Sequence, residues 1–532
     1  MKQIFIALTL GWLPITLFAQ QSRNLLNAKE LGVKKVYKSW HRAMKNPAQV
    51  YRLDLSNQKL GQISRNIHVF TRLQELRLSH NQLETLSDEL TALPHLQILD
   101  VSHNKLTELP DFIQKLKSLH TLKLAHNQIS QLPEALADLT QLKHLDVRAN
   151  PIQKLPPTFG NLTKLKTFDA SPALKTEWQL LRKKNRWFTN LKEALQTPNQ
   201  VYRLELHGVQ EVPVQDLKKF KNLEVLKLNN NSIRHLPREI GDLTSLKELH
   251  LQNNLLTTVP AEVSKLRNLE VLNLKMNRLE SLPQEVNDLT SLRELDLYRN
   301  RLQSLPIGLN KLKSLQKLNL SYNQLNALPK DFAGLENLKT LNLRSNALQQ
   351  LPEPIGKLNQ LKTLYLGNNQ LAELPQSIGH LKNLEKLDLQ ANVLKKLPEN
   401  LGDLKALKNL QLRKNQLEQL PKSLGNLKNL ANLDTWGNAL QNLPKSIGGL
   451  KKLKNLNLAY NKLTALPESL GNLESLEKLN LWNNGSLLKL PTSLGQLKNL
   501  QSFKMQLDKL PIGERNLLQN RLITTKVRGL RF

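Results

Sequence analysis

Cysteine is absent from all 532 residues of the chain. This absence excludes structural disulfides, zinc sites built on thiolates and any enzyme that uses a cysteine nucleophile. It also means that no lipid-anchored cysteine can follow the N-terminal segment. Whatever stabilises the chain must come from its packed core.

Catalytic motifs are missing as well. The sequence has no HExxH, G-x-S-x-G or calcium-loop pattern, and Gly356-Lys357 lacks the upstream spacing of a phosphate-binding loop. Carboxylates are scattered by a repeating pattern and are not paired. We therefore expect no enzymatic activity, no cofactor and no metal.

Long apolar runs are scarce, and the one candidate stands at the N-terminus. Lys2, the apolar stretch 4–18 and Ala19 before Gln20 have the order of a secretory signal peptide over residues 1–19. Pro14 interrupts the stretch, which is short for a membrane span of about 20 apolar residues. We predict an exported protein (periplasmic, cell-surface or secreted). The alternative is a cytoplasmic protein that retains this segment.

A 23-residue pattern fills most of the chain. It reads L-x-x-L-x-L-x-x-N-x-L-x-x-L-P, as in the stretch 269–283, and we call its asparagines the marker asparagines. They are Asn81, Asn104, Asn127, Asn150, Asn231, Asn254, Asn277, Asn300, Asn323, Asn346, Asn369, Asn392, Asn415, Asn438, Asn461 and Asn484.

The L-x-L segment alternates apolar and polar residues, which is the period of a half-buried strand. Leu272 and Leu274 should point inward, and each such leucine contributes roughly 1.5–3 kcal/mol when stacked repeats bury it. The marker asparagines follow the strands, where their amides can satisfy main-chain groups of neighbouring turns. We interpret them as a structural ladder. Prolines and glycines recur on the opposite side, where we expect extended segments or short helical turns.

The phrase LPxxIGxLxxLxxLxLxxNxL resembles the leucine-rich repeats of the Ras-group proteins, of plant disease-resistance proteins and of large bacterial sets. The resemblance covers roughly residues 50–508. It implies an α/β repeat solenoid, a horseshoe with a parallel concave β-sheet and an irregular or short-helical convex side. It also implies protein–protein recognition without chemistry. The lack of cysteine separates the chain from the bacterial repeat-linked ubiquitin ligases.

Two arrays are predicted, because the stretch 39–55 recurs at 190–206 with VYRL unchanged. Each copy is interpreted as a helical cap followed by a first strand, since the open end of a repeat core must be covered. We expect the second cap to stack on the first array in a nearly continuous coil. The predicted segments are a signal peptide 1–19, an N-terminal cap 20–49, a first array 50–173, a linker and second helical cap 174–200, a second array 201–508 and a C-terminal cap 509–532.

In the asparagine-marked repeats of the second array, the tyrosines and tryptophans all lie four, two or one residues before a marker asparagine. These positions point outward from the sheet, so the rings should line the concave face, where aromatic side chains are typical of binding surfaces. The competing interpretation is that aromatic residues simply favour strands. Thr435 stands where leucine is expected, through either adjustment to a ligand or drift. The predicted ligand-binding residues are Tyr298, Tyr322, Tyr365, Trp436, Tyr460, Trp482, Arg299, Arg344 and Arg413.

A histidine stripe marks the first array. His80, His103 and His126 each precede a marker asparagine, so their imidazoles could share a metal or titrate near neutral pH. The next repeat has Ala149 in this slot, and no carboxylate recurs beside the three. We favour repeat copying over metal binding.

The net charge is +32, from 76 Lys and Arg against 44 Asp and Glu. One position of the repeat, located ahead of the strand, is basic in many repeats. This recurrence predicts a basic edge along the coil. An anionic glycan, lipopolysaccharide or membrane surface would suit it, although a solvated, soluble face is the simpler interpretation. No nucleic-acid motif is present. The edge comprises Arg267, Lys313, Lys382, Lys405, Lys428, Lys451 and Lys498.

Three functions remain open at this point. The leading hypothesis is a non-catalytic scaffold that binds a protein or peptide partner on the concave face of the second array. A second is a cell-envelope adhesin for anionic polysaccharide. A third is an intracellular signalling adaptor of the Ras-group type.

Overall fold

The computed structural model describes residues 25–522, so the predicted signal peptide lies outside the described residues. The chain divides into two compact units, Met1–Arg186 and Trp187–Phe532. Each unit has its own parallel sheet and its own leucine core. The repeat solenoid predicted from the sequence is confirmed.

Each repeat begins with a strand of three residues and returns through a helical turn. In the repeat of β12 (Val271–Asn273), Leu272 and Leu274 are buried, while Lys275 stays partly exposed. The chain then runs through Pro283 into a 3₁₀ turn at Gln284–Asp288. The proline precedes that turn with φ −67°, which suits its ring. Equivalent turns occur at Arg238–Asp242, Glu399–Asp403 and Lys422–Asn426.

The first unit contains a seven-stranded parallel sheet whose strands follow chain order. Helices α2 (Ala28–Gly32) and α3 (Trp40–Met44) precede most of it, and Trp40 packs edge-on against Phe70. The strands are β1 (Val36–Tyr37), β2 (Arg52–Asp54), β3 (Glu75–Arg77), β4 (Ile98–Asp100), β5 (Thr121–Lys123), β6 (His144–Asp146) and β7 (Thr167–Asp169).

The first part of the predicted linker is instead a helix that closes the first unit. Helix α4 (Pro172–Asn185) packs on the 3₁₀ turn Pro157–Asn161, and Leu174 and Trp178 are buried in the core of that unit. The expectation of a linker was therefore wrong for these residues. Leu174, Trp178 and Leu181 recur at helical spacing, which provides the apolar face that covers the last repeat.

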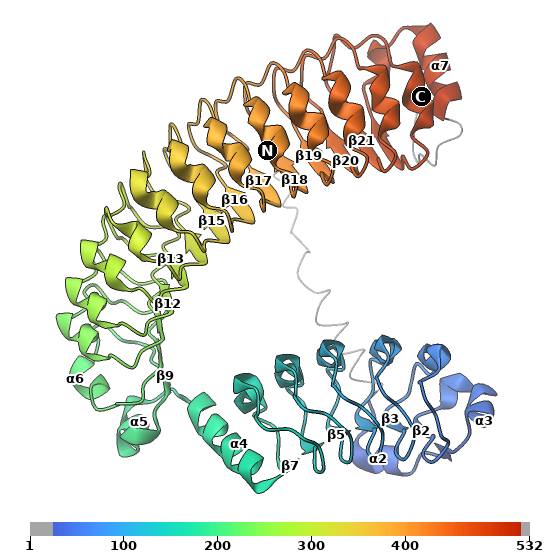
Figure 1. The fold of residues 1–532 in the computed structure, drawn as a ribbon, viewed down its shortest axis with the longest axis vertical. Coiled ribbons are helices and arrows are strands. Elements are labelled where there is room, and N and C mark those ends of the chain that lie inside the picture. The colour runs from blue at the N-terminus through green and yellow to red at the C-terminus, as the bar shows by residue number, and fades with distance from the viewer. Residues whose placement is uncertain (1–24, 523–532) are drawn as a thin grey trace, which may run out of the picture. The chain divides into compact units, whose positions relative to one another are not determined.

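The second unit contains a fifteen-stranded parallel sheet, again in chain order. In Figure 1 its strands line the inner side of an arc and its helical turns line the outer side. Helix α5 (Leu191–Gln196) lies near its start, α6 (Val214–Leu217) in its first repeat, and α7 (Ile512–Leu522) at its end. The strands are β8 (Trp187–Phe188), β9 (Arg203–Glu205), β10 (Val225–Lys227), β11 (Glu248–His250), β12, β13 (Glu294–Asp296), β14 (Lys317–Asn319), β15 (Thr340–Asn342), β16 (Thr363–Tyr365), β17 (Lys386–Asp388), β18 (Asn409–Gln411), β19 (Asn432–Asp434), β20 (Asn455–Asn457), β21 (Lys478–Asn480) and β22 (Ser502–Lys504).

Register within this sheet is constant, which aligns equivalent residues of successive repeats. Leu272 pairs with Leu295, and Leu295 with Leu318. Adjacent strands of a sheet stand about 4.8 Å apart. Residues at one repeat position therefore form a stripe across the concave face. We call each such stripe a column.

Candidate binding surface on the concave face

The marker asparagines join successive repeats beside the concave face. Asn277 donates from Nδ2 to the main-chain oxygens of Leu251 and Leu274, both at 2.9 Å, and accepts from Leu256 N at 3.0 Å. The same bonds recur at Asn369, Asn392 and Asn461. These amides satisfy main-chain groups that lose their ladder partners where each strand ends, so they hold the surface in place.

The residue immediately before each marker asparagine has an unusual backbone. His80, Arg299, Tyr322, Lys414 and Tyr460 all have φ between 52° and 57°, in the left-handed region. This region is uncommon for residues other than glycine, asparagine and aspartate. Several repeats do place asparagine or glycine there, as at Asn253 and Gly437. The conformation turns the chain away from the sheet and projects these side chains at the rim of the concave face.

Two pairs of aromatic rings form on this face. Tyr298 and Tyr322 meet edge-to-face with centroids 5.3 Å apart, and Trp436 and Tyr460 are tilted with centroids 5.0 Å apart. Trp482 lies two strands beyond Trp436 and is 44% exposed, while Tyr322 is 48% exposed. Large rings that are exposed on a rigid sheet can pack against a ligand.

Tyr365 lies apart from the other aromatic residues. It is the last residue of β16 and occupies the column four residues before the marker asparagine, where Lys386 Nζ lies 4.8 Å from its ring centroid. The structure therefore brings four of the six predicted aromatic residues into two pairs and leaves Tyr365 and Trp482 outside these pairs.

Two cations lie beside Trp436 of the second aromatic pair. The guanidinium of Arg413 lies 5.3 Å from the ring of Trp436, and Lys414 Nζ lies 5.8 Å from it. Arg413 Nε also lies 3.6 Å from a carboxylate oxygen of Asp434. Burial raises the pKa of Asp434, while the N–H of Trp436 and the charge of Arg413 oppose that rise. This patch therefore combines ring faces with positive charge.

The other two predicted arginines differ in their surroundings. Arg299 is exposed at the rim, next to Tyr298. Arg344 is half-buried, and its Nε is buried without a hydrogen-bond partner. A ligand could therefore meet this guanidinium only at its terminal nitrogens, which carry the other N–H donors.

Thr435 is fully buried in the core slot that leucine occupies in other repeats. Its hydroxyl donates to the main-chain oxygen of Asn457 at 3.1 Å. Its polar atom is thus satisfied within the fold, and the buried side chain is not part of the surface.

Trp187 belongs to the concave sheet, although its position in a basic stretch suggested a linker. It forms β8, pairs with Arg203, and has Lys227 Nζ 4.1 Å from its ring centroid. The signal that could have found it is the offset of 151 residues between the two caps, which aligns Trp187 with Val36 of β1.

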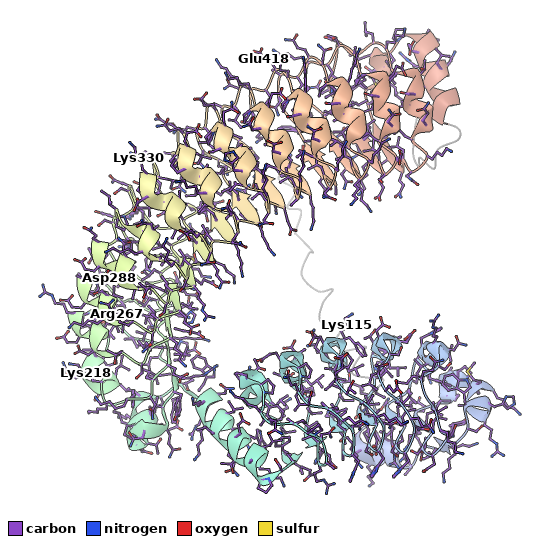
Figure 2. The ribbon with its side chains drawn as sticks, in the orientation of Figure 1. Lys115, Lys218, Arg267, Asp288, Lys330 and Glu418 are labelled. Carbon is purple, nitrogen blue, oxygen red and sulfur yellow. The ribbon has the colours of Figure 1, made fainter. Side chains whose placement is uncertain are left out.

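The basic edge is exposed, and much of it also has a structural role. Arg267 reaches the main-chain oxygen of Asp288 at 3.5 Å, and Figure 2 shows both residues on the outer flank of the second unit. Lys313, Lys405, Lys428 and Lys451 likewise donate to main-chain oxygens that end 3₁₀ turns, at 2.8–3.2 Å. Cations are favourable at such helical ends. Lys382 and Lys498 are exposed on the same edge.

In the first unit, the imidazoles of His80, His103 and His126 stack in parallel. Their centroids are 4.0 and 4.1 Å apart, and the planes differ by 12° in each pair. Burial, followed by the charges of His80 and His126, lowers the pKa of His103, and Asp100 opposes this. Within residues 25–522, no three histidine, aspartate or glutamate side chains are arranged to hold a metal ion.

Comparison with known proteins agrees with this architecture. The family described as "Leucine-rich repeat region" matches residues 199–324, 303–408 and 398–524. The families "Leucine rich repeat" and "Leucine Rich repeats (2 copies)" match residues 94–152 and 71–115. No curated protein matches the sequence.

Among solved structures, a leucine-rich repeat protein of Leptospira interrogans is 31% identical, covers 93% of this chain and 100% of its own, and has a TM-score of 0.52. The Arabidopsis receptor kinase HAESA, in complex with the peptide hormone IDA and the co-receptor SERK1, is 28% identical over 86% of this chain and 78% of its own, with a TM-score of 0.50. A TDR receptor is 27% identical over 89% and 87%, with a TM-score of 0.51.

The described helices are all too short or too polar to cross a membrane. Repeat pattern, fold and comparisons converge on one assignment: the chain belongs to the leucine-rich repeat family.

Proposed function

We propose that this protein is a non-catalytic binding scaffold that recognises a protein or peptide partner on the concave face of its second unit. The observation that carries the proposal is the placement of six aromatic residues on that face, four of them in two pairs. Large rings on a rigid surface supply contact area at little cost in conformational entropy, and tryptophan, tyrosine and arginine are enriched at binding hot spots.

Relatives give this proposal its second support. The structure of HAESA, whose fold and sequence resemble this chain over most of its length, is a complex with a peptide hormone and a co-receptor. In this chain, an extended parallel sheet offers a surface on which a peptide could lie. We also propose export, for which the support is the N-terminal sequence, with Lys2, the apolar stretch 4–18 and Ala19.

The test is capture of partners from cell-envelope extract by the wild-type chain and by a Trp436→Ala, Trp482→Ala variant. Both rings are outside the core, so the variant should keep its far-UV circular dichroism and thermal midpoint while losing a partner that the wild type retains at high salt. Ile307→Ala is the matched control, because Ile307 is 74% exposed beside a 3₁₀ turn on the outer side. Equal capture by all three proteins contradicts the proposal.

A second candidate function is adhesion to anionic polysaccharide through the basic edge. The specific support is that all seven basic side chains are exposed on one edge of the unit. Binding of this kind falls steeply as salt rises. Charge reversal at Lys382 and Lys498 should weaken it, and capture that is insensitive to salt contradicts it.

A further inference from the structure

The two columns at the rim of the concave face carry charge of one sign only. We call the positions two and one before the marker asparagines of the second unit the rim band. In all twelve of these repeats the rim band contains no aspartate and no glutamate. Its cations are Lys275, Arg299, Arg344, Arg413 and Lys414, and its aromatic residues are Tyr298, Tyr322, Trp436, Tyr460 and Trp482.

The nearest carboxylates are engaged by the main chain. Asp296, Asp388 and Asp434 lie in the column four residues before the marker asparagines. Each accepts from the main-chain N–H two residues later, at Tyr298, Gln390 and Trp436, with distances of 3.0–3.1 Å. Arg413 is the one rim-band cation with an ion pair to this column, at 3.6 Å from Asp434. These three carboxylates keep their charge, but the five cations of the rim band outnumber them, so the surface beside the ring faces stays net positive.

The cations and rings fall into two clusters along the sheet. The first cluster spans the repeats of β12 to β15, and the second spans those of β18 to β21. Between them, the repeats of β16 and β17 place Gly367, Asn368, Gln390 and Ala391 in the rim band, so this stretch is neutral and mostly small. Each cluster joins at least two cations to one of the two aromatic pairs.

The first cluster contains a donor that lacks an acceptor. Arg344 is half-buried and its Nε is buried without a partner, and the residue in the same column of the next strand is Gly367, which has no side chain to accept from the guanidinium. Arginine presents a planar fork of donors that matches a carboxylate. A ligand carboxylate would pair with the terminal nitrogens of this guanidinium, which are not among its buried atoms.

From this geometry we infer that the ligand of the concave face is an acidic peptide in extended conformation, with two groups of acidic and aromatic or apolar side chains. The inference rests on the proposed function and names the chemistry of its partner. Tyr322 and Trp436 are five strands apart, roughly 24 Å at about 4.8 Å per strand, and an extended chain at about 3.3 Å per residue spans this in about seven residues. The acidic groups face the cations, and the apolar groups pack on the ring pairs.

The neutral stretch between the clusters favours a peptide over a nucleic acid. A single-stranded nucleic acid carries a phosphate at every nucleotide, and proteins that bind it use a continuous positive groove. Here the repeats of β16 and β17 offer no cation in the rim band. A peptide can place uncharged residues over this stretch and acidic residues at either end.

The experiment is selection from a displayed library of random twelve-residue peptides on the full chain, followed by sequencing of the retained pool. We expect the frequency of Asp and Glu to rise at least twofold over the input, in two groups separated by about five to seven residues. The affinity of a leading peptide, measured by fluorescence anisotropy, should fall at least tenfold in an Arg344→Glu, Lys414→Glu variant. It should also fall as salt rises.

Control variants keep the outcome interpretable. Lys330→Glu with Lys445→Glu reverses two exposed charges on the outer side, where Figure 2 places Lys330, and should leave affinity unchanged. Arg344→Gln with Lys414→Gln serves if the reversed variant fails to fold, and should still weaken binding severalfold.

Four results overturn the inference, and they differ in what they say of the proposed function. Retained peptides that depend on Trp436 and Trp482 but lack an excess of Asp and Glu overturn the inference and leave the proposed function standing. Acidic peptides that bind the charge-reversed variant as tightly as the wild type also overturn it. A twelve-nucleotide oligodeoxythymidylate that binds more tightly than the leading peptide assigns the band to nucleic acid instead. No enrichment of any peptide overturns the inference, and the capture experiment with Trp436→Ala, Trp482→Ala then decides the proposed function.

Discussion

The side-chain Oδ1 of Asn392 accepts a hydrogen bond from the main-chain N–H of Leu371 at 3.0 Å, which ties one repeat to the next. The Nδ2 of the same buried amide donates to the main-chain oxygens of Leu366 and Leu389, both at 3.0 Å. Asn392→Ala leaves these groups buried and unpaired, and we expect it to lower the free energy of unfolding by about 2–4 kcal/mol.

Urea unfolding followed by circular dichroism measures this loss. Gln370→Ala is the control, because Gln370 is an exposed amide beside a marker asparagine of the same unit. Equal stability of the two variants would show that the asparagine ladder is dispensable.

A close approach between neighbouring 3₁₀ turns gives a second prediction. A Cβ added at Gly402 would collide with the main-chain oxygen and the Cβ of Ser423 in the following repeat. Because the collision involves backbone, neither turn can move alone, and Gly402→Ala should destabilise the second unit by about 1–3 kcal/mol. Thermal unfolding checks this against Gly485→Ala, where an added Cβ meets nothing within 4 Å and the midpoint should not fall.

The fold followed from the sequence because its determinants are local and repeated. Leu272 and Leu274 alternate with polar residues, and that alternation alone predicts a strand with one buried face. The cap helix α4 was missed because Trp178 lies in a basic stretch, although Leu174, Trp178 and Leu181 have helical spacing. The basic residues on the exposed face of α4 made the sequence resemble a linker, although the other face of the helix is apolar and buried.

The candidate site could be predicted only in part. Strand alternation predicted that Tyr298 and Trp436 face outward, and the structure places them there. The main-chain bonds of Asp296 and Asp434, the unpartnered Nε of Arg344 and the lysine bonds to 3₁₀ turns were not predicted. These hydrogen bonds, and the absence of one at Arg344 Nε, depend on the positions of individual atoms. The sequence pattern gives only the residue type at each repeat position and does not specify atomic positions. The binding role of the surface stays a prediction.

A third prediction concerns acid stability on the convex side. The carboxylate of Glu468 accepts from the main-chain N–H groups of Thr492 and Ser493, both at 2.9 Å, and these bonds lower the pKa of Glu468 to about 2. The folded state therefore favours the ionised carboxylate, so its contribution to stability is complete above the ordinary pKa near 4.5 and is lost as pH falls toward 2.

Glu468→Gln should consequently lower the thermal midpoint of the second unit by a constant amount from pH 8 to 5, and by a shrinking amount below pH 4.5. Glu418→Gln removes one carboxylate from the outer side, where Figure 2 places Glu418, and controls for net charge. A difference between wild type and Glu468→Gln that stays constant down to pH 2.5 contradicts the assignment.

The stacked imidazoles of the first unit give the last prediction. Burial and the neighbouring rings lower the pKa of His103, so the folded state resists a proton that the unfolded chain accepts near pH 6.5. The contribution of this stack to stability is therefore complete above pH 6.5 and falls as the pH drops below it.

Asn can replace His at all three positions without backbone strain, because φ there is 53–56° and asparagine tolerates this region. The variant His80→Asn, His103→Asn, His126→Asn should lose less thermal stability between pH 8 and 5 than the wild type, and an NMR titration should place the pKa of His103 below 6.5. If both proteins lose the same stability over this range, the stack does not couple protonation to folding, and the three histidines are repeat copies without electrostatic consequence.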